Sequence, residues 1–406
     1  MASTGPSLRE LKVLELSSGA AGPVAARYFA EQGATVVRVE SSKRPDFLRI
    51  LQLTPDSAHG LDGAPMFILL NPNKESVSVN LKTPEGIGLV ERLVAWADVV
   101  LENFSPGVME RLGLDYESLR RIRPDLIMLS GCLFGQTGPQ RAYPGFGGQG
   151  TAIAGFNHLT GWPDREPVGP YGTLTDSLAP RYAALAVAGA LLERRRTGRG
   201  QYLDLSQIEA GVYSLSELVV RHGAEGEIPT RRGNGSEHAA PHGVYPCAGS
   251  DRWIAIAVLD DQAWRALRTA MGDPDWAREP GYTSAEGRLR HEDEIDSKLG
   301  EWTRGFEAPA LMVKLQALGV EAGVVQTLED LGEDPQLAHR GHFQEIEHVH
   351  LGAMRFERSG FRLSENPGGL DRPGPNLGEH NARVLGEYLG LDAAEIARLA
   401  DAGALE

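Results

Sequence analysis

Short apolar strands alternate with helical stretches along residues 11–130, and this alternation narrows the range of possible folds more than any other feature. Leu11–Leu16 predicts a strand, Val24–Gln32 a helix and Ala34–Glu40 a second strand. Because the connections are short, the strands of such a unit should pair in parallel with a right-handed crossover. The small residues between the first strand and helix do not have the glycine spacing typical of dinucleotide binding.

The alternation continues with strands predicted at Val77–Leu81, Asp98–Phe104 and Leu126–Ser130. Between them, Thr83–Trp96 predicts a helix with Thr83 as its N-cap, and Tyr116–Ile122 predicts another. Four alternations of this kind favour an α/β fold with a doubly wound parallel sheet. Ligands of such sheets bind beyond the strand ends, where four side chains are expected to lie: Lys74, Asn103, Phe104 and Arg111.

Composition argues against several classes of partner. The chain has 406 residues, of which 41% are hydrophobic, enough for two or three domains. Its formal net charge of -15 disfavours nucleic acid and anionic membrane surfaces. Cys132 and Cys247 have no metal-like spacing, so neither a metal site nor a disulfide framework is predicted. With no signal peptide and no apolar run long enough to cross a membrane, we expect a cytoplasmic protein.

A single carboxylate, Asp176, stands where a glycine-containing loop leads into the apolar run Tyr182–Leu192. The small apolar residues of that run are typical of a buried helix. By position alone, Asp176 or Ser177 could be the N-cap of this helix. An aspartate is also ionised at neutral pH, so it can attack a thioester carbonyl without an activating base.

Short motifs lie in one order along nearly the whole chain: Leu14–Pro23, Asn73–Ser76, Lys82–Gly86, Glu102–Gly107, Thr197–Gln201, Pro241–Cys247 and Leu377–His380. Together they resemble the family III CoA-transferases, to which the α-methylacyl-CoA racemases are related. The resemblance implies a Rossmann-like large domain built from both chain ends, a smaller inserted α+β domain, and a homodimer of interlocked protomers. The expected segments are a large-domain part at 1–205, a linker helix at 206–229, the insert at 230–326, and the return to the large domain at 327–406.

The resemblance also implies roles for individual residues. Asp176 is the expected nucleophile, and the expected coenzyme A contacts are Lys74, Asn103, Phe104, Arg111 and Arg141. Coenzyme A moves from an acyl-CoA donor, such as succinyl-CoA, to a small carboxylic acid through an aspartyl anhydride and an aspartyl-CoA thioester. The thioester is a substrate, and neither a tightly bound cofactor nor a metal is expected.

Backbone N–H groups of glycine-rich loops are candidates for stabilising the oxyanions of this reaction. The candidates are Gly19, Ala20, Gly233 and Gly235. Some transferases of the family have a glutamine at the place of Ala20, so any amide contact to the intermediate must come from elsewhere in this chain.

Cations near the predicted insert could bind a second carboxylate of the substrate. Arg231 and Arg232, with His238 and His242, are the candidates, because a negatively charged protein must hold an anion with local cations. If they do so, a dicarboxylic acid is favoured as substrate. The alternative is that these residues form a polar linker between domains.

Three other functions are consistent with parts of the same pattern. Intramolecular CoA transfer within a dicarboxylic acid would use the same aspartate. A non-catalytic CoA-binding subunit, paired with a paralogous active subunit, would explain the lack of an amide at Ala20. Racemisation ranks below transfer, because Gly145–Gly147 lacks the His and Asp bases that the racemases carry in this segment.

Overall fold

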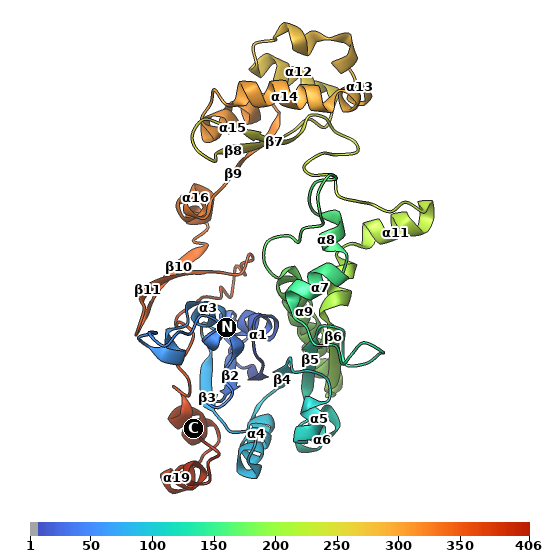
Figure 1. Ribbon diagram of the computed structural model, residues 1–406. Coiled ribbons are helices and arrows are strands. Elements are labelled where there is room, and N and C mark those ends of the chain that lie inside the picture. The colour runs from blue at the N-terminus through green and yellow to red at the C-terminus, as the bar shows by residue number, and fades with distance from the viewer. Residues whose placement is uncertain (1–6) are drawn as a thin grey trace. The chain divides into compact units, whose positions relative to one another are not determined.

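The computed structural model describes residues 7–406 and divides them into two compact units (Figure 1). The first unit contains the described residues up to Asn157, together with Gly169–Ile228 and Ala338–Glu406. The second contains His158–Val168 and Pro229–Leu337. The chain therefore enters the second unit twice.

The strands are β1 (Lys12–Leu16), β2 (Thr35–Glu40), β3 (Glu75–Ser78), β4 (Val99–Glu102), β5 (Ile127–Cys132), β6 (Gln201–Ser206), β7 (His242–Pro246), β8 (Trp253–Ala257), β9 (Glu321–Val325), β10 (Phe343–His348) and β11 (Gly352–Glu357). The longer helices are α1 (Ala21–Glu31), α4 (Pro84–Trp96), α9 (Leu174–Thr197), α11 (Ser216–Glu225), α12 (Asp261–Ala270), α14 (Glu292–Thr303), α15 (Ala308–Ala317) and α19 (Ala393–Asp401). The shorter ones are α2 (Phe47–Ile50), α3 (Pro65–Leu70), α5 (Val108–Leu112), α6 (Tyr116–Ile122), α7 (Gly147–Ile153), α8 (Phe156–Leu159), α10 (Gln207–Tyr213), α13 (Ala285–Arg290), α16 (Leu328–Glu333), α17 (Pro335–His339) and α18 (Asn381–Arg383). The described residues also form three short 3₁₀ helices, η1 (Gly60–Gly63), η2 (Asp275–Arg278) and η3 (Pro280–Tyr282), and one π-helix, η4 (Val384–Tyr388).

A parallel sheet forms the centre of the first unit, with strand order β3-β2-β1-β4-β5-β6. The predicted α/β fold with a parallel sheet is therefore confirmed. The strand order reverses between β1 and β4. In open α/β sheets, ligands bind at such a reversal, beyond the carboxyl ends of the strands.

Successive residues of β1 enter two different cores, because side chains alternate between the faces of a sheet. Val13 packs in a cluster with residues of α1 and α9, and Leu14 packs in another with residues of α4 and α6. Leu399 joins the cluster of Leu14, and Val79 bridges to Leu405. The C-terminal segment therefore packs on the sheet built by the N-terminal part of the chain (Figure 1).

Helix α9 is only partly buried, which corrects the prediction of a buried apolar helix. Ala183, Val187 and Ala190 pack on the sheet, whereas Leu185 and Leu192 are each 70% exposed. The segment Tyr182–Leu192 is apolar on all sides. The sequence therefore does not indicate which face packs on the sheet, because no polar residues mark the other face.

The second unit has its own core around the antiparallel sheet of β7, β8 and β9. Ile254 of β8, Trp264 of α12 and Leu311 of α15 are buried in it. The segment 158–168 is joined to this unit by a hydrogen bond in which the N–H of Gly233 donates to the carbonyl of Gly161 at 2.8 Å. Within residues 7–406, none of the helices combines the length and the apolar character needed to cross a membrane.

Candidate active site

Asp176 lies in the first turn of α9, not at its cap. The N-cap residue is Thr173, and the backbone N–H of Asp176 donates to the Thr173 carbonyl at 3.0 Å. The interpretation of Asp176 or Ser177 as the N-cap is therefore wrong. The side chain of Asp176 is buried, with 9% of the residue exposed.

Glycines let three helices meet around Asp176. A Cβ atom on Gly147 of α7 would lie 2.3 Å from Oδ2 of Asp176, and one on Gly150 would lie 2.5 Å from Oγ1 of Thr175. A Cβ atom on Gly211 of α10 would lie 3.2 Å from Cγ2 of Thr175. The first two contacts are shorter than any that a real Cβ atom makes, and the third would be tight, so these positions favour glycine. Asp176 thus sits against the backbone of α7.

The pKa of Asp176 depends on its burial and on the neutral groups beside it. Burial raises the pKa of Asp176 above its ordinary value, while the side chains of Thr173 and Gln207 and the backbone N–H of Gly147 act in the opposite direction as donors. In the described part of the chain, no Lys, Arg or His forms an ion pair with Asp176. The carboxylate of Asp176 therefore lies among neutral groups of α7, α9 and α10.

Thr173, Gly147 and Gln207 are absent from the residues predicted above to form the site. The pair Gly147 and Gly150, three residues apart on one helix face, is the sequence signal that could have indicated a close helix contact. Gln207 carries no such signal, because it is far from Asp176 along the chain.

Asn103 joins the two loops at the reversal point of the sheet. Its Oδ1 accepts from the N–H of Ser18 and its Nδ2 donates to the Ser18 carbonyl, both at 2.8 Å. A Cβ atom on Gly22 would lie 2.9 Å from Cγ of Asn103, so the start of α1 also touches this side chain. The amide of Asn103 is thus engaged in holding the β1–α1 loop.

A small cavity lies beside this loop, between α1, α9 and the strands β4 and β5. Gly22, Glu102, Asn103 and Gln207 are among the residues that line it, and about 20 Å³ of it is open to a water-sized sphere. That volume is enough for about one water molecule. Burial raises the pKa of Glu102 to about 7, although the N–H of Phe104 donates to its Oε2 at 2.7 Å.

Glu102→Gln is expected to stabilise the protein at about pH 8. The folded-state pKa of Glu102 is about 7, and an unfolded glutamate has a pKa of about 4.3. The folded state therefore holds a proton that the unfolded state has lost, and stability falls as the pH rises through this interval. Since one pKa unit corresponds to about 1.4 kcal/mol, the variant should gain up to about 3 kcal/mol above the interval.

Urea unfolding at about pH 8 and about pH 5 measures this gain, which should shrink at the lower pH. Glu91→Gln, at an exposed position of α4, is the matched control and should change stability little at either pH. Equal effects of the two substitutions on stability at both pH values would contradict the raised pKa of Glu102.

Lys74 lies inside the first unit. It immediately precedes β3 and so lies at the amino end of that strand, whereas ligands of such sheets bind beyond the carboxyl ends. Its Nζ is 2.8 Å from Oε2 of Glu15 and donates to the Pro23 carbonyl and to Oδ1 of Asn71, each at 2.8 Å. Burial lowers the pKa of Lys74 to about 8, against the opposing effect of Glu15. The ammonium group of Lys74 therefore makes two hydrogen bonds and one ion pair inside the protein.

The same buried network engages one of the predicted oxyanion donors. Arg38 forms ion pairs with Glu15 and Asp46, and Asp46 in turn accepts from the N–H of Gly19 at 3.2 Å. Ala20 is the N-cap residue of α1. The N–H of Gly19 is therefore occupied in this structure.

Phe104 and Arg111 follow β4 and lie near the reversal point, as predicted. Phe104 is half-buried against the core that contains Leu14, and Arg111, at the end of α5, has its Nη1 near Gly107. Arg141 is exposed in the loop before α7. Neither arginine forms an ion pair with any residue that the structure describes, so both guanidinium groups can meet an anion.

The backbone N–H groups of Gly233 and Gly235, the oxyanion donors predicted in the second unit, already form hydrogen bonds within the protein. The N–H of Gly233 donates to Gly161, and that of Gly235 donates to the Arg232 carbonyl at 3.2 Å. Arg232 itself forms an ion pair with Glu237 at 2.8 Å. These residues therefore shape a loop within the second unit.

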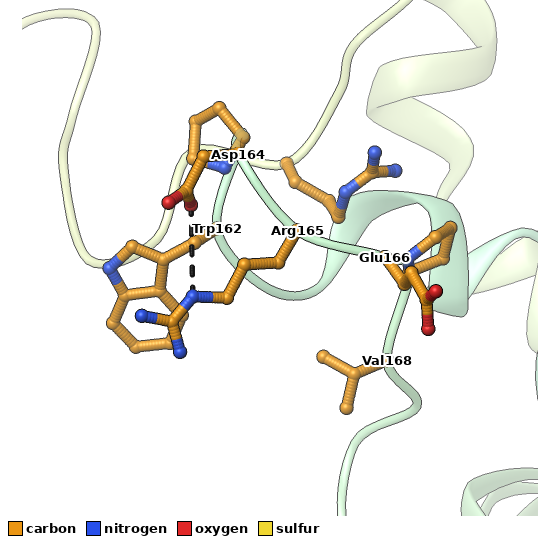
Figure 2. A pocket seen from close by; sticks show the side chains of 8 residues that line it. Trp162, Asp164, Arg165, Glu166 and Val168 are labelled. Atoms are coloured by element: carbon orange, nitrogen blue, oxygen red, sulfur yellow. Dashed lines mark ion pairs between the residues drawn. The ribbon is translucent and has the colours of Figure 1, made fainter.

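Arg231 lines an open pocket of about 940 Å³ together with residues 162–168 (Figure 2). Its Nη1 donates to the His158 carbonyl at 3.3 Å, and its Nε is buried without a hydrogen-bond partner among residues 7–406. Arg165 forms an ion pair with Asp164 at 3.8 Å and lies 6.0 Å from the ring of Trp162. The pocket combines an aromatic surface with cations and carboxylates.

Comparison with known proteins gives a consistent result. The model of CoA-transferase family III matches residues 8–381. A succinyl-CoA–D-citramalate CoA-transferase of Chloroflexus aurantiacus is 36% identical over 393 residues, which cover 97% of this chain and 96% of the relative. The alpha subunit of a succinyl-CoA–L-malate CoA-transferase of Chloroflexus aurantiacus is 34% identical over 394 residues, or 97% of this chain and 91% of that subunit. Among solved structures, a CaiB/BaiF family protein from Brucella suis superimposes with a TM-score of 0.86 at 33% identity, covering 95% of this chain and 100% of that one.

Proposed function

The chain belongs to CoA-transferase family III, and we propose that it moves coenzyme A from succinyl-CoA to a small carboxylic acid through covalent intermediates on Asp176. The observation that carries this proposal is the buried carboxylate of Asp176, which lies against Gly147 of α7 and forms no ion pair with any described residue. A charged oxygen held in a fixed position is what attack on a thioester requires.

The proposed reaction has four balanced steps. Asp176 attacks the thioester carbonyl and expels the CoA thiolate, which leaves a mixed anhydride of Asp176 and the donor acid. The thiolate attacks the Asp176 carbon and expels the donor carboxylate, which gives an aspartyl-CoA thioester. The acceptor carboxylate attacks that carbon and expels the thiolate, which forms a second anhydride. The thiolate then attacks the acceptor carbonyl, releasing the new acyl-CoA and free Asp176.

Phe104, Arg111 and Arg141 are the residues we assign to coenzyme A binding. The guanidinium groups of Arg111 and Arg141, which form no ion pair with a described residue, suit phosphates, and the half-buried ring of Phe104 suits the adenine. We assign Asn103 and Lys74 an indirect role, because their polar atoms are engaged with the protein. They would hold the loops that form the edge of the coenzyme site.

Dicarboxylic acids are the substrates we propose, since the relatives described above are named for succinyl-CoA and for hydroxylated dicarboxylic acids. Arg231 is our candidate for the second carboxylate, because it is a cation that lines an open pocket. Intramolecular transfer would use the same groups, but no contact in the structure favours it.

We also propose a dimer of this chain. Leu185 and Leu192 of α9 and Val220 of α11 are each 70% exposed, which is typical of surfaces that meet a partner. A second copy is the simplest occupant. A paralogous subunit is the alternative, since one relative is named as the alpha subunit of its enzyme.

Intact-protein mass spectrometry tests the proposed covalent route. Brief exposure to succinyl-CoA should add a CoA-sized mass, because the aspartyl-CoA thioester accumulates when no acceptor is present. Acetyl-CoA serves as the comparison donor, and Asp176→Ala should show no adduct with either. An adduct that persists in Asp176→Ala would place the nucleophile elsewhere, and binding of succinyl-CoA without any adduct would favour a non-catalytic subunit.

A further inference from the structure

The loop between β1 and α1, residues 17–20, is fixed by side chains of other segments. Nη2 of Arg38, from β2, donates to the Ser17 carbonyl at 2.9 Å. Asn103, which follows β4, bonds both polar backbone atoms of Ser18 at 2.8 Å. The loop follows β1 at the reversal of strand order, where ligands of open α/β sheets bind. Its conformation therefore bears on the coenzyme site of the proposed function.

Asp46 joins this loop to the segment that follows β2. Both of its carboxylate oxygens accept from the N–H of Gly19 at 3.2 Å. Oδ1 also accepts from the N–H of Leu48 at 2.7 Å, which makes Asp46 the N-cap of α2, and Oδ2 forms an ion pair with Arg38. The side chain of Asp46 is only 1% exposed, so water does not compete for these contacts.

Arg38 fixes the position of Asp46 within the first unit. The guanidinium group of Arg38 also forms ion pairs with Glu15 of β1 and, at 3.5 Å, with Glu40 of β2. A buried cation depends on its carboxylate partners, because the loss of one leaves charge that water cannot solvate. Asp46 is therefore held by the sheet on one side, and it holds Gly19 on the other.

We propose that Asp46 is a positioning residue, which keeps the β1–α1 loop in the conformation that binds coenzyme A. This inference rests on the proposed function. Asp46 acts through Gly19, whose φ of 77° turns the chain sharply at this point. Without an acceptor for the Gly19 N–H, the loop can adopt other conformations. Ordering it again on binding would then weaken the affinity for the coenzyme.

Asparagine cannot make the contacts of Asp46. Both carboxylate oxygens accept from donors, whereas an amide has one acceptor oxygen and one NH2 group. In either orientation, the NH2 group would face a donor, either Arg38 or the N–H of Leu48. Asp46→Asn therefore weakens the hold on the loop while it keeps the size of the side chain.

Asp46→Asn should raise the Kd of CoA, measured by calorimetry, about 10-fold or more, as expected for loss of a hydrogen bond to a charged group. The succinyl-CoA concentration that gives half-maximal formation of the CoA-sized adduct should rise by the same factor. The maximal rate of adduct formation should be unchanged, because the substitution removes binding and no contact with the reacting atoms. Asp392→Asn, the same change at the N-cap of α19, should leave all three quantities unchanged.

Asp46→Ser separates the contact with the loop from the capping of α2. Serine is a good N-cap, but it has a single uncharged oxygen, so the contacts with Gly19 and Arg38 should be lost while the cap remains. This variant should weaken CoA binding as Asp46→Asn does, and urea unfolding shows which variants are folded.

Wild-type affinity for CoA in folded Asp46→Ser would overturn this inference and leave the proposed function intact. A lower maximal rate with unchanged affinity would overturn it as well. Absence of a CoA-sized adduct on the wild-type protein would instead overturn the proposed function.

Discussion

Asp176→Asn is expected to reduce CoA transfer about 10⁴-fold or more, since a side-chain amide cannot replace an ionised nucleophile. Asparagine is close in size to aspartate, so the contacts with α7 should survive. The variant should also be at least as stable as the wild type at about pH 8. The pKa of Asp176 is raised in the folded state, so ionisation costs stability as the pH rises above the unfolded value, and asparagine removes that cost.

Initial rates at saturating succinyl-CoA and acceptor, together with urea unfolding at about pH 8 and about pH 5, measure both effects. The stability difference should decrease at the lower pH, where the unfolded aspartate also takes up a proton. A variant that is inactive because it is unfolded would show a lower unfolding midpoint at both pH values. Turnover near the wild-type rate in a folded variant would exclude Asp176 as the nucleophile.

Gly147→Ala is expected to lower the rate of transfer about 100-fold, because a displacement of about 1 Å at reacting atoms has an effect of this size. The added Cβ would lie 2.3 Å from Oδ2 and 2.4 Å from Cγ of Asp176, distances at which one of the two groups must move. Overpacking of this kind should also lower the free energy of unfolding by about 1–3 kcal/mol.

Gly148→Ala is the matched control, one residue further along α7. A Cβ atom there would have no neighbour within 4 Å. Alanine is the better helix former by about 1 kcal/mol at interior positions, so this variant should be slightly more stable and fully active. Similar losses in both variants would indicate that α7 as a whole is sensitive to alanine, and would contradict the close contact with Asp176.

Local patterns allowed much of the sheet and several helix ends to be predicted. Thr83 is the N-cap of α4 and accepts from the N–H of Gly86 at 3.1 Å, and α6 has the predicted bounds Tyr116–Ile122. Caps and short apolar strands depend on neighbours in sequence, so their signals are local. The strand predicted at Val77–Leu81 begins earlier, at Glu75, because it pairs with β2 from Val37 onward.

The details of the site could not be predicted in the same way, because they depend on contacts between distant residues. Lys74 looks like a surface cation in the sequence, and only the fold shows that Glu15 and Asn71 surround its ammonium group. The contact of Gly147 with Asp176 requires the crossing of α7 and α9.

The double entry of the chain into the second unit has a consequence for protein engineering. Residues 158–168 are the shorter of its two segments. A chimera that exchanged only residues 229–337 for those of a relative would combine the relative's longer segment with the shorter segment of this chain. In this chain, the carbonyl of Gly161 accepts from the N–H of Gly233, and a Cβ atom on Gly233 would lie 3.2 Å from Nε1 of Trp162. The two segments therefore pack closely against each other. The shorter segment ends at Val168, eight residues before Asp176. Poor packing of this segment would therefore displace the loop that leads to Asp176. An exchange of the second unit between relatives therefore requires both segments to be transferred together.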